Sequence, residues 1–247
     1  MSEELQRIEQ LEKEIRELKG LNEEGIPTYS FSNIKIEDLE NLLDIKKSFD
    51  DTPFESWFNN NLSISSKNIN FLQTLLKKYG KFIKAYKEET LKANFIIPII
   101  NQVDFLSLEA EISPFYEEII TYKTDKFIFT GSTDFTISKG LEYGRKPYFF
   151  IQEFKKGKVT TDPEPQLLAE LVSAIELNNY ISMKGAYIVG SIWNFVILEK
   201  IKKDRYRYFI SENFDSTKIE DLKGIYKNLL FVKNEIIDNE LIQKDKI

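Results

Sequence analysis

The sequence predicts an α/β fold with a mixed central sheet of four or more strands, flanking helices and an N-terminal helical extension. Before Ser107 apolar residues recur at spacings of three and four, which is typical of helices. After Ser107 the spacing approaches two, which is typical of strands. A helical segment, DPEPQLLAELVSAIELNNY, then interrupts the strands, and Asp162 directly before Pro163 marks its start.

The first 21 residues are predicted to form an amphipathic helix that ends near Gly20. Its apolar positions fit two heptads with β-branched residues at a and leucine at d, a combination that favours parallel dimers: Ile8, Leu11, Ile15 and Leu18. Two heptads alone form a marginal helix, so packing of this helix on its own domain explains the pattern equally well. A homodimer through the N-terminal helix is therefore one of two expectations.

The remaining chain divides into a helical prelude and linker over residues 22–66 and a main domain over residues 67–247. The prelude contains one predicted helix over residues 36–50, and the main domain begins with helices over residues 67–89 and 88–105. The predicted strands cover residues 107–113, 115–122, 126–138, 147–158, 185–201 and 204–214. A last helix is expected from residue 219 to about residue 237.

The absence of two residue types restricts the chemistry. The 247 residues include no histidine and no cysteine, which excludes Ser-His-Asp and Cys-His catalysis, His-ligated zinc, thiolate metal sites and disulfides. A metal site would be built from oxygen ligands, which suit hard cations. We therefore expect Mg²⁺, with Mn²⁺ as a substitute.

The net charge bears on whether the chain binds nucleic acid, and its hydropathy bears on whether it enters a membrane. The net charge of −6 is unusual for a nucleic-acid-binding protein, but residues 139–158 carry six basic and two acidic side chains. No apolar run approaches the roughly 20 residues that span a bilayer, and the first thirty residues do not resemble a signal peptide. We expect a cytoplasmic protein without a membrane partner.

Three charged side chains are expected to meet at one end of the sheet. Glu153 and Lys155 lie two residues apart in a predicted strand and so share a face, while Phe154 points into the core. Gly140 and Gly144 suit a hairpin turn before this strand. Such a turn places Asp134 across from about Ile151, within a residue or two of Glu153.

A divalent cation would give this grouping a physical purpose, because two adjacent carboxylates repel each other unless a cation joins them. The bound ion can polarise a phosphodiester and help ionise a water molecule, and Lys155 can orient that water or stabilise developing charge. The context matters more than the tripeptide, because [DE]xK occurs four times, at Glu17, Asp44, Glu153 and Asp221. The pattern at Glu153 is the one that follows an apolar strand and precedes a helix.

These motifs resemble those of the PD-(D/E)XK nuclease superfamily, and most closely branches allied to the N-terminal nuclease domains of type I restriction subunits. The resemblance covers roughly residues 85 to 200. EETLKANFIIPII is similar to the family's first helix, GSTDFTI to its aspartate-bearing strand, FFIQEFKKGK to its (D/E)xK strand, and the following helix to its glutamine-bearing helix. The resemblance implies a restriction-endonuclease-like core.

The resemblance also implies roles for individual residues. Asp134 and Glu153 would be metal ligands, with the carbonyl of Phe154 and the carboxylate of Glu88 as further ligands. Lys155 would be the catalytic lysine, and the catalytic group would comprise Lys155, Glu153, Asp134 and Gln166. Glu88 also suits a charge that complements a helix dipole, and Gln166 also suits a capping or solvent-facing role.

Two features depart from the family pattern. Related branches often carry tyrosine four residues after the glutamine, where this sequence has Glu170. The family's later strand often reads Gly, Thr, Asp, Gly and then Trp, whereas here Gly190, Trp193 and Phe195 remain without the Thr-Asp pair. Aromatic residues of these strands suit stacking on unpaired bases, but also an ordinary core.

The resemblance implies a Mg²⁺-dependent nuclease that hydrolyses DNA, with RNA as an alternative substrate, acting in restriction, defence or repair. A catalytically silent module of the same fold, binding nucleic acid or protein and assembled through the N-terminal helix, is the main alternative. A plain coiled-coil adaptor is a third. For Glu153 and Lys155 alone, a surface ion pair on an edge strand also remains open.

The heptads generate one prediction about assembly. If they pair two chains, a protein that lacks residues 1–21 is expected to be a monomer where the full chain is a dimer, as measured by light scattering after gel filtration. An unchanged oligomeric state would remove the coiled-coil dimer.

Overall fold

The computed structural model describes residues 25–155 and 162–244, together with Arg7 and Leu11. The expected helix over residues 1–21, and any dimer through it, lies outside the described residues apart from those two. No helix in the described ranges is both long and apolar enough to cross a lipid bilayer.

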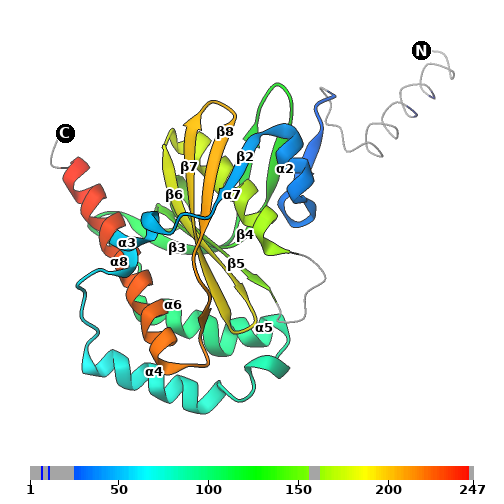
Figure 1. The fold of residues 1–247 in the computed structure, drawn as a ribbon. Helices are drawn as coiled ribbons and strands as arrows, with labels where there is room; N and C mark the ends of the chain where they lie inside the picture. The colour runs from blue at the N-terminus through cyan, green and yellow to red at the C-terminus, as the bar shows by residue number, and fades with distance from the viewer. Residues whose placement is uncertain (1–6, 8–10, 12–24, 156–161, 245–247) are drawn as a thin grey trace.

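A mixed sheet forms the centre of the molecule (Figure 1). Its strands in the described ranges are β1 (Thr28–Ser30), β2 (Asp44–Ser48), β3 (Ile112–Lys123), β4 (Ile128–Lys139), β5 (Arg145–Lys155), β6 (Ser182–Val189), β7 (Ile192–Lys202), β8 (Arg205–Ile210) and β9 (Phe214–Asp215). The order is β1-β4-β5-β6-β7-β8-β2, with β3 paired to β4 and β9 to β7. Parallel pairing joins β1 to β4, β5 to β6 and β2 to β8, and the other pairs are antiparallel.

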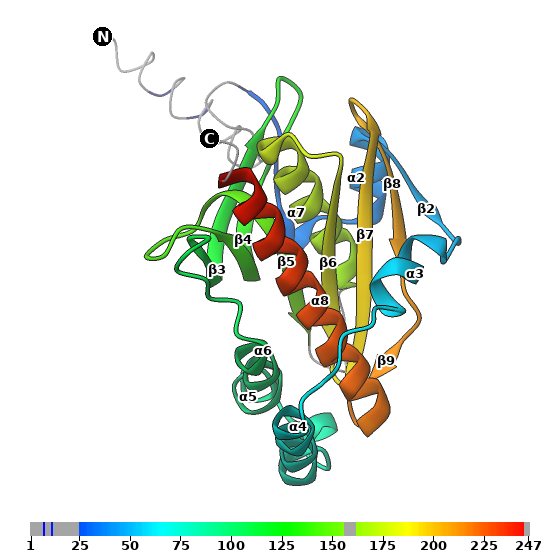
Figure 2. The same cartoon turned by 90° about the vertical axis from the view of Figure 1, so that its left-hand side faces the viewer.

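Helices cover both faces of this sheet, and two hydrophobic cores separate them from it (Figure 2). One face packs against α3 (Thr52–Phe58), α4 (Ser66–Tyr79), α5 (Glu88–Leu91), α6 (Ile97–Val103) and α8 (Ile219–Lys244). The other packs against α2 (Ile36–Leu42) and α7 (Pro163–Asn178). The turns η1 (Phe31–Asn33) and η2 (Ile83–Ala85) are 3-10 helices, and the π-helical turn η3 (Lys92–Ile96) joins α5 to α6. The predicted α/β class with a mixed, helix-flanked sheet is confirmed.

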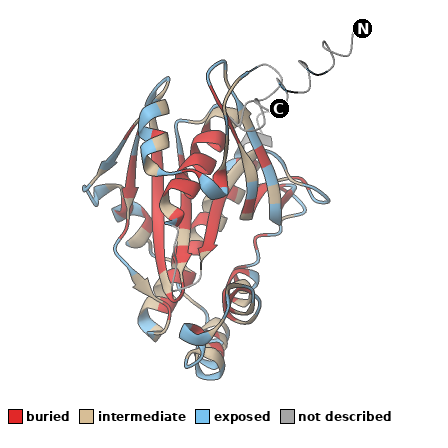
Figure 3. Cartoon of the chain, turned by 90° about the vertical axis from the view of Figure 1, so that its right-hand side faces the viewer, coloured by how far each residue is buried: buried red, intermediate tan, exposed pale blue. Residues whose placement is uncertain are grey.

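Helix α7 is buried on nearly all sides, and Figure 3 shows burial concentrated in this helix and the adjoining strands. Every residue from 165 to 175 is buried, as expected for a helix whose apolar residues surround its axis. The side chain of Asp162 accepts the amide hydrogen of Glu164 at 2.9 Å, which confirms its capping role. Polar residues on α7 are therefore placed beside the sheet, away from water.

Several predicted element boundaries are wrong. The helix expected over residues 36–50 ends at Leu42, and Asp44–Ser48 pairs instead with β8 as strand β2. The helix expected over residues 67–89 ends at Tyr79, before Gly80. The segment expected as one strand over residues 185–201 is a hairpin of β6 and β7, which turns at Gly190, where φ is +63°.

The segment before residue 67 contributes to the same sheet as the rest of the chain. It supplies β1 and β2, and α3 inserts Trp57 into the core shared with α8. Trp57 is fully buried, packs on Phe195 with ring centroids 5.0 Å apart, and donates its indole hydrogen to the carbonyl of Asn228 at 2.9 Å. The described part of this segment is thus integrated into the fold.

This packing predicts a large effect of truncating Trp57. Trp57→Ala is expected to lower the free energy of unfolding by about 3–5 kcal/mol, because it removes a buried indole and its hydrogen bond. Urea denaturation measures the change, and Phe49→Ala is the control because Phe49 is 88% exposed. Equal stability of the two variants would contradict the integration of α3 into the core.

Candidate active site

The candidate site lies along β4, at the point where the partner of this strand changes. On the side opposite β3, the first residues of β4 pair with β1 and its last residues pair with β5. Residues 131–134 lie between these two stretches and have no described strand on that side. Gly131 belongs to this gap, and the ring of Phe31 lies so close that a Cβ at position 131 would be 2.9 Å from Phe31 Cδ2.

Asp134 and Glu153 bridge the gap through hydrogen bonds in both directions. The amide of Phe154 on β5 donates to Asp134 Oδ2 at 2.8 Å, and the amide of Asp134 donates to Glu153 Oε1 at 3.1 Å. Each carboxylate thus accepts a backbone amide that the parted strands leave without a ladder partner. Both carboxylates are consequently held at the point where the two strands separate.

The predicted register was slightly wrong, although the two acids meet. Thr136, rather than Asp134, lies opposite Ile151, and Phe135 lies opposite Gln152. Continuing this register places Asp134 level with Glu153. The predicted turn between the strands is confirmed, since residues 140–144 connect β4 to β5.

Glu153 is fully buried and faces α7. Its Oε2 accepts a hydrogen bond from Gln166 Nε2 at 2.7 Å, and Lys155 Nζ lies 3.5 Å from the same oxygen. The alternative of a solvent-exposed surface ion pair is excluded, because the Glu153 side chain is 0% exposed and that of Lys155 is 19% exposed. The Asp44–Lys46 pair on β2 provides the contrast: its nitrogen and oxygen are 3.6 Å apart and the Lys46 side chain is 78% exposed.

Glu170 places a second buried carboxyl beside Glu153. Gln166 Nε2 donates to Glu170 Oε1 at 3.1 Å, while Glu170 Oε2 is buried and has no hydrogen-bond partner among the described residues. Burial, together with the mutual repulsion of the acids, raises the pKa of Glu153 well above its ordinary value. Burial likewise raises the pKa of Glu170 to about 8. The amide of Gln166 joins the two carboxyl groups.

Lys92 brings a positive charge to the other side of Asp134. Its Nζ lies 2.9 Å from Asp134 Oδ1, 3.2 Å from Glu88 Oε1 and 3.4 Å from Glu89 Oε1. Burial lowers the pKa of Lys92, but the hydrogen bond and charge of Asp134 and the charge of Glu88 outweigh this effect and raise it above its ordinary value. The sequence interpretation missed this residue, although Lys92 is the sole charged residue between Leu91 and Ile100.

The structure therefore brings the predicted residues together around one gap. Asp134, Glu153, Lys155 and Gln166 are linked directly, and Glu88 joins them through Lys92. The carbonyl of Phe154 points to the same side of β5 as its amide, toward Asp134, because both groups of a strand residue face one neighbour. No pattern in the sequence predicted that Glu170 would lie beside Glu153, because this proximity depends on the packing of α7 against β5.

The oxygen donors at the gap fit a hard divalent cation. Asp134 and Glu153 carry carboxylate oxygens with spare lone pairs, and Glu170 has a buried oxygen without a partner. No three acidic side chains in the described chain are arranged as a ready-made metal cage. Two of the predicted ligands, Glu88 and Asp134, are separated by the ammonium group of Lys92.

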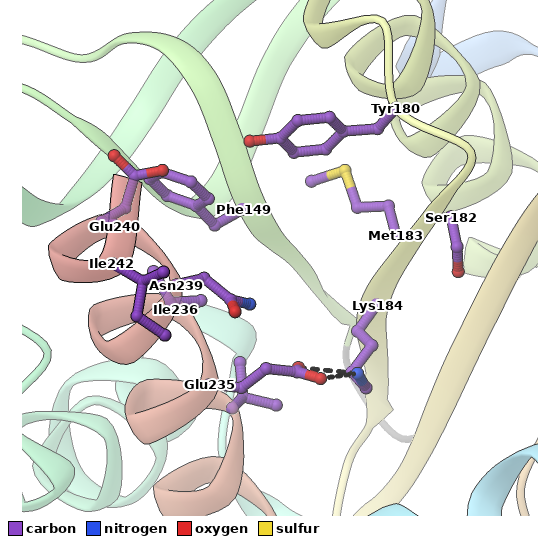
Figure 4. A pocket seen from close by; sticks show the side chains of 11 residues that line it. Phe149, Tyr180, Ser182, Met183, Lys184, Glu235, Ile236, Asn239, Glu240 and Ile242 are labelled. Atoms are coloured by element: carbon purple, nitrogen blue, oxygen red, sulfur yellow. Dashed lines mark hydrogen bonds and ion pairs between the residues drawn. The ribbon is translucent and has the colours of Figure 1, made fainter. Parts of the chain in front are cut away.

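Of two cavities in the described chain, one includes a residue of the candidate site in its wall and the other does not. One of about 420 Å³ lies between residues 32–37 and the first turn of α7, and Gln166 forms part of its wall. Another, of about 490 Å³, lies between the beginning of β6 and α8 (Figure 4). Its Lys184 and Glu235 are ion-paired at 2.6 Å, and none of the acidic gap residues line it. The first cavity is the one that reaches the candidate site.

Comparison with known proteins assigns no family to this chain. No protein-family model matches the sequence, and no curated protein matches it.

The buried carboxyl of Glu170 predicts a pH-dependent stability. Its pKa is about 8 in the folded protein and near its ordinary 4.5 when unfolded, so the folded state binds more protons between these values. Stability should therefore fall as pH rises through this window. Glu170→Gln, which has no proton to lose, should flatten the decline in urea denaturation with EDTA at pH 5 and pH 9.

The exposed Glu142→Gln is the matched control, and it should follow the wild-type pH dependence. Parallel curves for Glu170→Gln and the wild type would contradict a raised pKa at Glu170.

Proposed function

We propose that this protein is a Mg²⁺-dependent nuclease of the PD-(D/E)XK type that hydrolyses phosphodiester bonds in DNA. The observation that carries the proposal is the pairing of Asp134 with Glu153 across the parted strands, with Lys155 3.5 Å from Glu153. A sheet requires no buried acids at such a point, and their burial raises the pKa of Glu153. A bound cation would offset that electrostatic cost.

The residues that would hold the cation are Asp134, Glu153, the carbonyl of Phe154 and Glu88. When bound, the ion would supply Lewis-acid stabilisation of the phosphate and lower the pKa of a water molecule. Lys155 would orient that water and balance the negative charge that develops on phosphorus oxygens. Gln166 would keep Glu153 in its observed orientation through the 2.7 Å hydrogen bond.

The overall reaction breaks one phosphorus–oxygen bond. The oxygen of water bonds to phosphorus, the sugar oxygen leaves and takes up a proton, and the water proton passes to solvent or to a nearby base. Water is the proposed nucleophile because a bound cation would help to ionise it, and no histidine is present to activate a serine or threonine hydroxyl in its place. DNA follows from the resemblance to nuclease domains, RNA is the alternative substrate, and restriction, defence or repair is the proposed setting.

One observation favours a different function. Lys92 already neutralises the acids beside it, with its ammonium 2.9 Å from Asp134 and 3.2 Å from Glu88. A site whose carboxylates are satisfied by a lysine is consistent with a catalytically silent module. Such a module would bind nucleic acid or protein and assemble through the N-terminal helix.

The nuclease proposal predicts a specific loss of activity. With linear, circular or single-stranded DNA and with RNA, cleavage is expected in Mg²⁺ or Mn²⁺ and not in EDTA. Lys155→Ala and Glu153→Gln should each lower the cleavage rate by about 10²-fold or more, since each removes a charge that acts in the transition state.

The control is Lys203→Ala, which removes an exposed lysine on the turn before β8 and should cleave at the wild-type rate. Cleavage that persists in Lys155→Ala and Glu153→Gln would identify a contaminant. Absence of cleavage by the wild type on all four substrates would favour the silent module.

A further inference from the structure

Lys92 occupies the position of a cation within the acidic site. Its side chain is 11% exposed, and its ammonium group lies within 3.4 Å of the three carboxylates of Glu88, Glu89 and Asp134. An ammonium group has three hydrogens to donate, which matches the number of acidic partners. Its charge also lies 5.6 Å from the ring centre of Phe154, on the strand that carries Glu153.

The local backbone helps to place this lysine. Lys92 begins the π-helical turn η3, which connects α5 to α6, and the neighbouring Leu91, Phe95 and Ile96 are all buried in the hydrophobic core. A π turn changes the direction in which successive side chains leave a helix, and such turns are frequent at functional sites. A lysine in this apolar surrounding is stable only because acids from α5 and β4 surround its charge.

We infer that Lys92 is a resident cation that sets the affinity of the site for divalent ions, because an ion that joins Glu88 to Asp134 must displace its ammonium group. This inference rests on the proposed function, since it concerns the same metal site. Before an ion binds, Lys92 keeps Glu88 and Asp134 together. When an ion binds, the charge of Lys92 repels it and the contact of Lys92 with Asp134 is lost.

Lys92 differs from Lys155, which contacts Glu153 on the side of the gap that faces α7. Lys92 is a positioning residue, because it acts on the carboxylates rather than on the phosphate. Removing its charge should therefore strengthen ion binding while weakening the ion-free fold. A residue with a merely structural role would weaken the fold and leave ion affinity unchanged or lower.

The test measures Mn²⁺ binding by calorimetry and thermal unfolding in EDTA and in Mn²⁺, using the full chain. Lys92→Met is expected to bind Mn²⁺ at least about tenfold more tightly than the wild type, because a like charge beside the ion is removed. Its melting temperature in EDTA should be lower than that of the wild type. Its gain in melting temperature on adding Mn²⁺ should be larger.

Two further variants keep the result interpretable. Lys87→Met removes the same charge from an exposed lysine directly before α5, and its Mn²⁺ affinity should stay within about twofold of the wild type, because solvent screens that charge. Lys92→Gln retains a hydrogen-bond donor without the charge, and should also bind Mn²⁺ more tightly. It replaces Lys92→Met if that variant does not fold in EDTA.

The outcomes separate this inference from the proposed function. Unchanged or weaker Mn²⁺ binding by folded Lys92→Met or Lys92→Gln, with clear binding by the wild type, would overturn the role of Lys92 and leave the metal site intact. Absence of binding by the wild type and by both Lys92 variants would overturn the metal site itself. Binding that appears only without Lys92, and is abolished by adding Asp134→Asn, would support the inference and identify the wild type as silenced by its own lysine.

Discussion

The reciprocal hydrogen bonding of Asp134 and Glu153 is the interaction on which the candidate site depends. Backbone amides inside a fold need acceptors, and a strand that loses its neighbour leaves such groups unpaired. Here the carboxylate of Asp134 accepts the amide of Phe154, and the carboxylate of Glu153 accepts the amide of Asp134. The same bonds that preserve the sheet hold both acids at the opening between β4 and β5.

Burial gives these acids their chemical character. Glu153 is buried against α7 beside Glu170 of that helix, and the side-chain amide of Gln166 joins the two carboxyl groups. Positive charge approaches from two directions, with Lys155 on β5 and Lys92 on η3. The two ammonium groups therefore partly neutralise the carboxylates, and the amide of Gln166 donates hydrogen bonds to them. Together these contacts determine how much negative charge the site presents to a ligand.

Much of this arrangement could be predicted from the sequence. Two-residue spacing places Glu153 and Lys155 on one face, and the glycines at positions 140 and 144 mark the turn that brings Asp134 close. What could not be predicted depends on long-range pairing. The segment Asp44–Ser48 continues a helical pattern, yet it pairs with β8 and buries Ile45, and such long-range packing overrides local propensity. The role of Lys92 likewise required the approach of α5 to β4, which no local pattern encodes.

Because β1 and β5 both pair with the same side of β4, the site needs residues from two distant segments of the chain. β1 comes from residues 28–30 and β5 from residues 145–155, so one opening is bounded by segments more than a hundred residues apart in the chain. A shortened protein that begins at residue 67 would lack β1 and the ring of Phe31 over Gly131. The gap beside Asp134 would then be wider and accessible to water. All the acids would remain, but solvent would screen their charges.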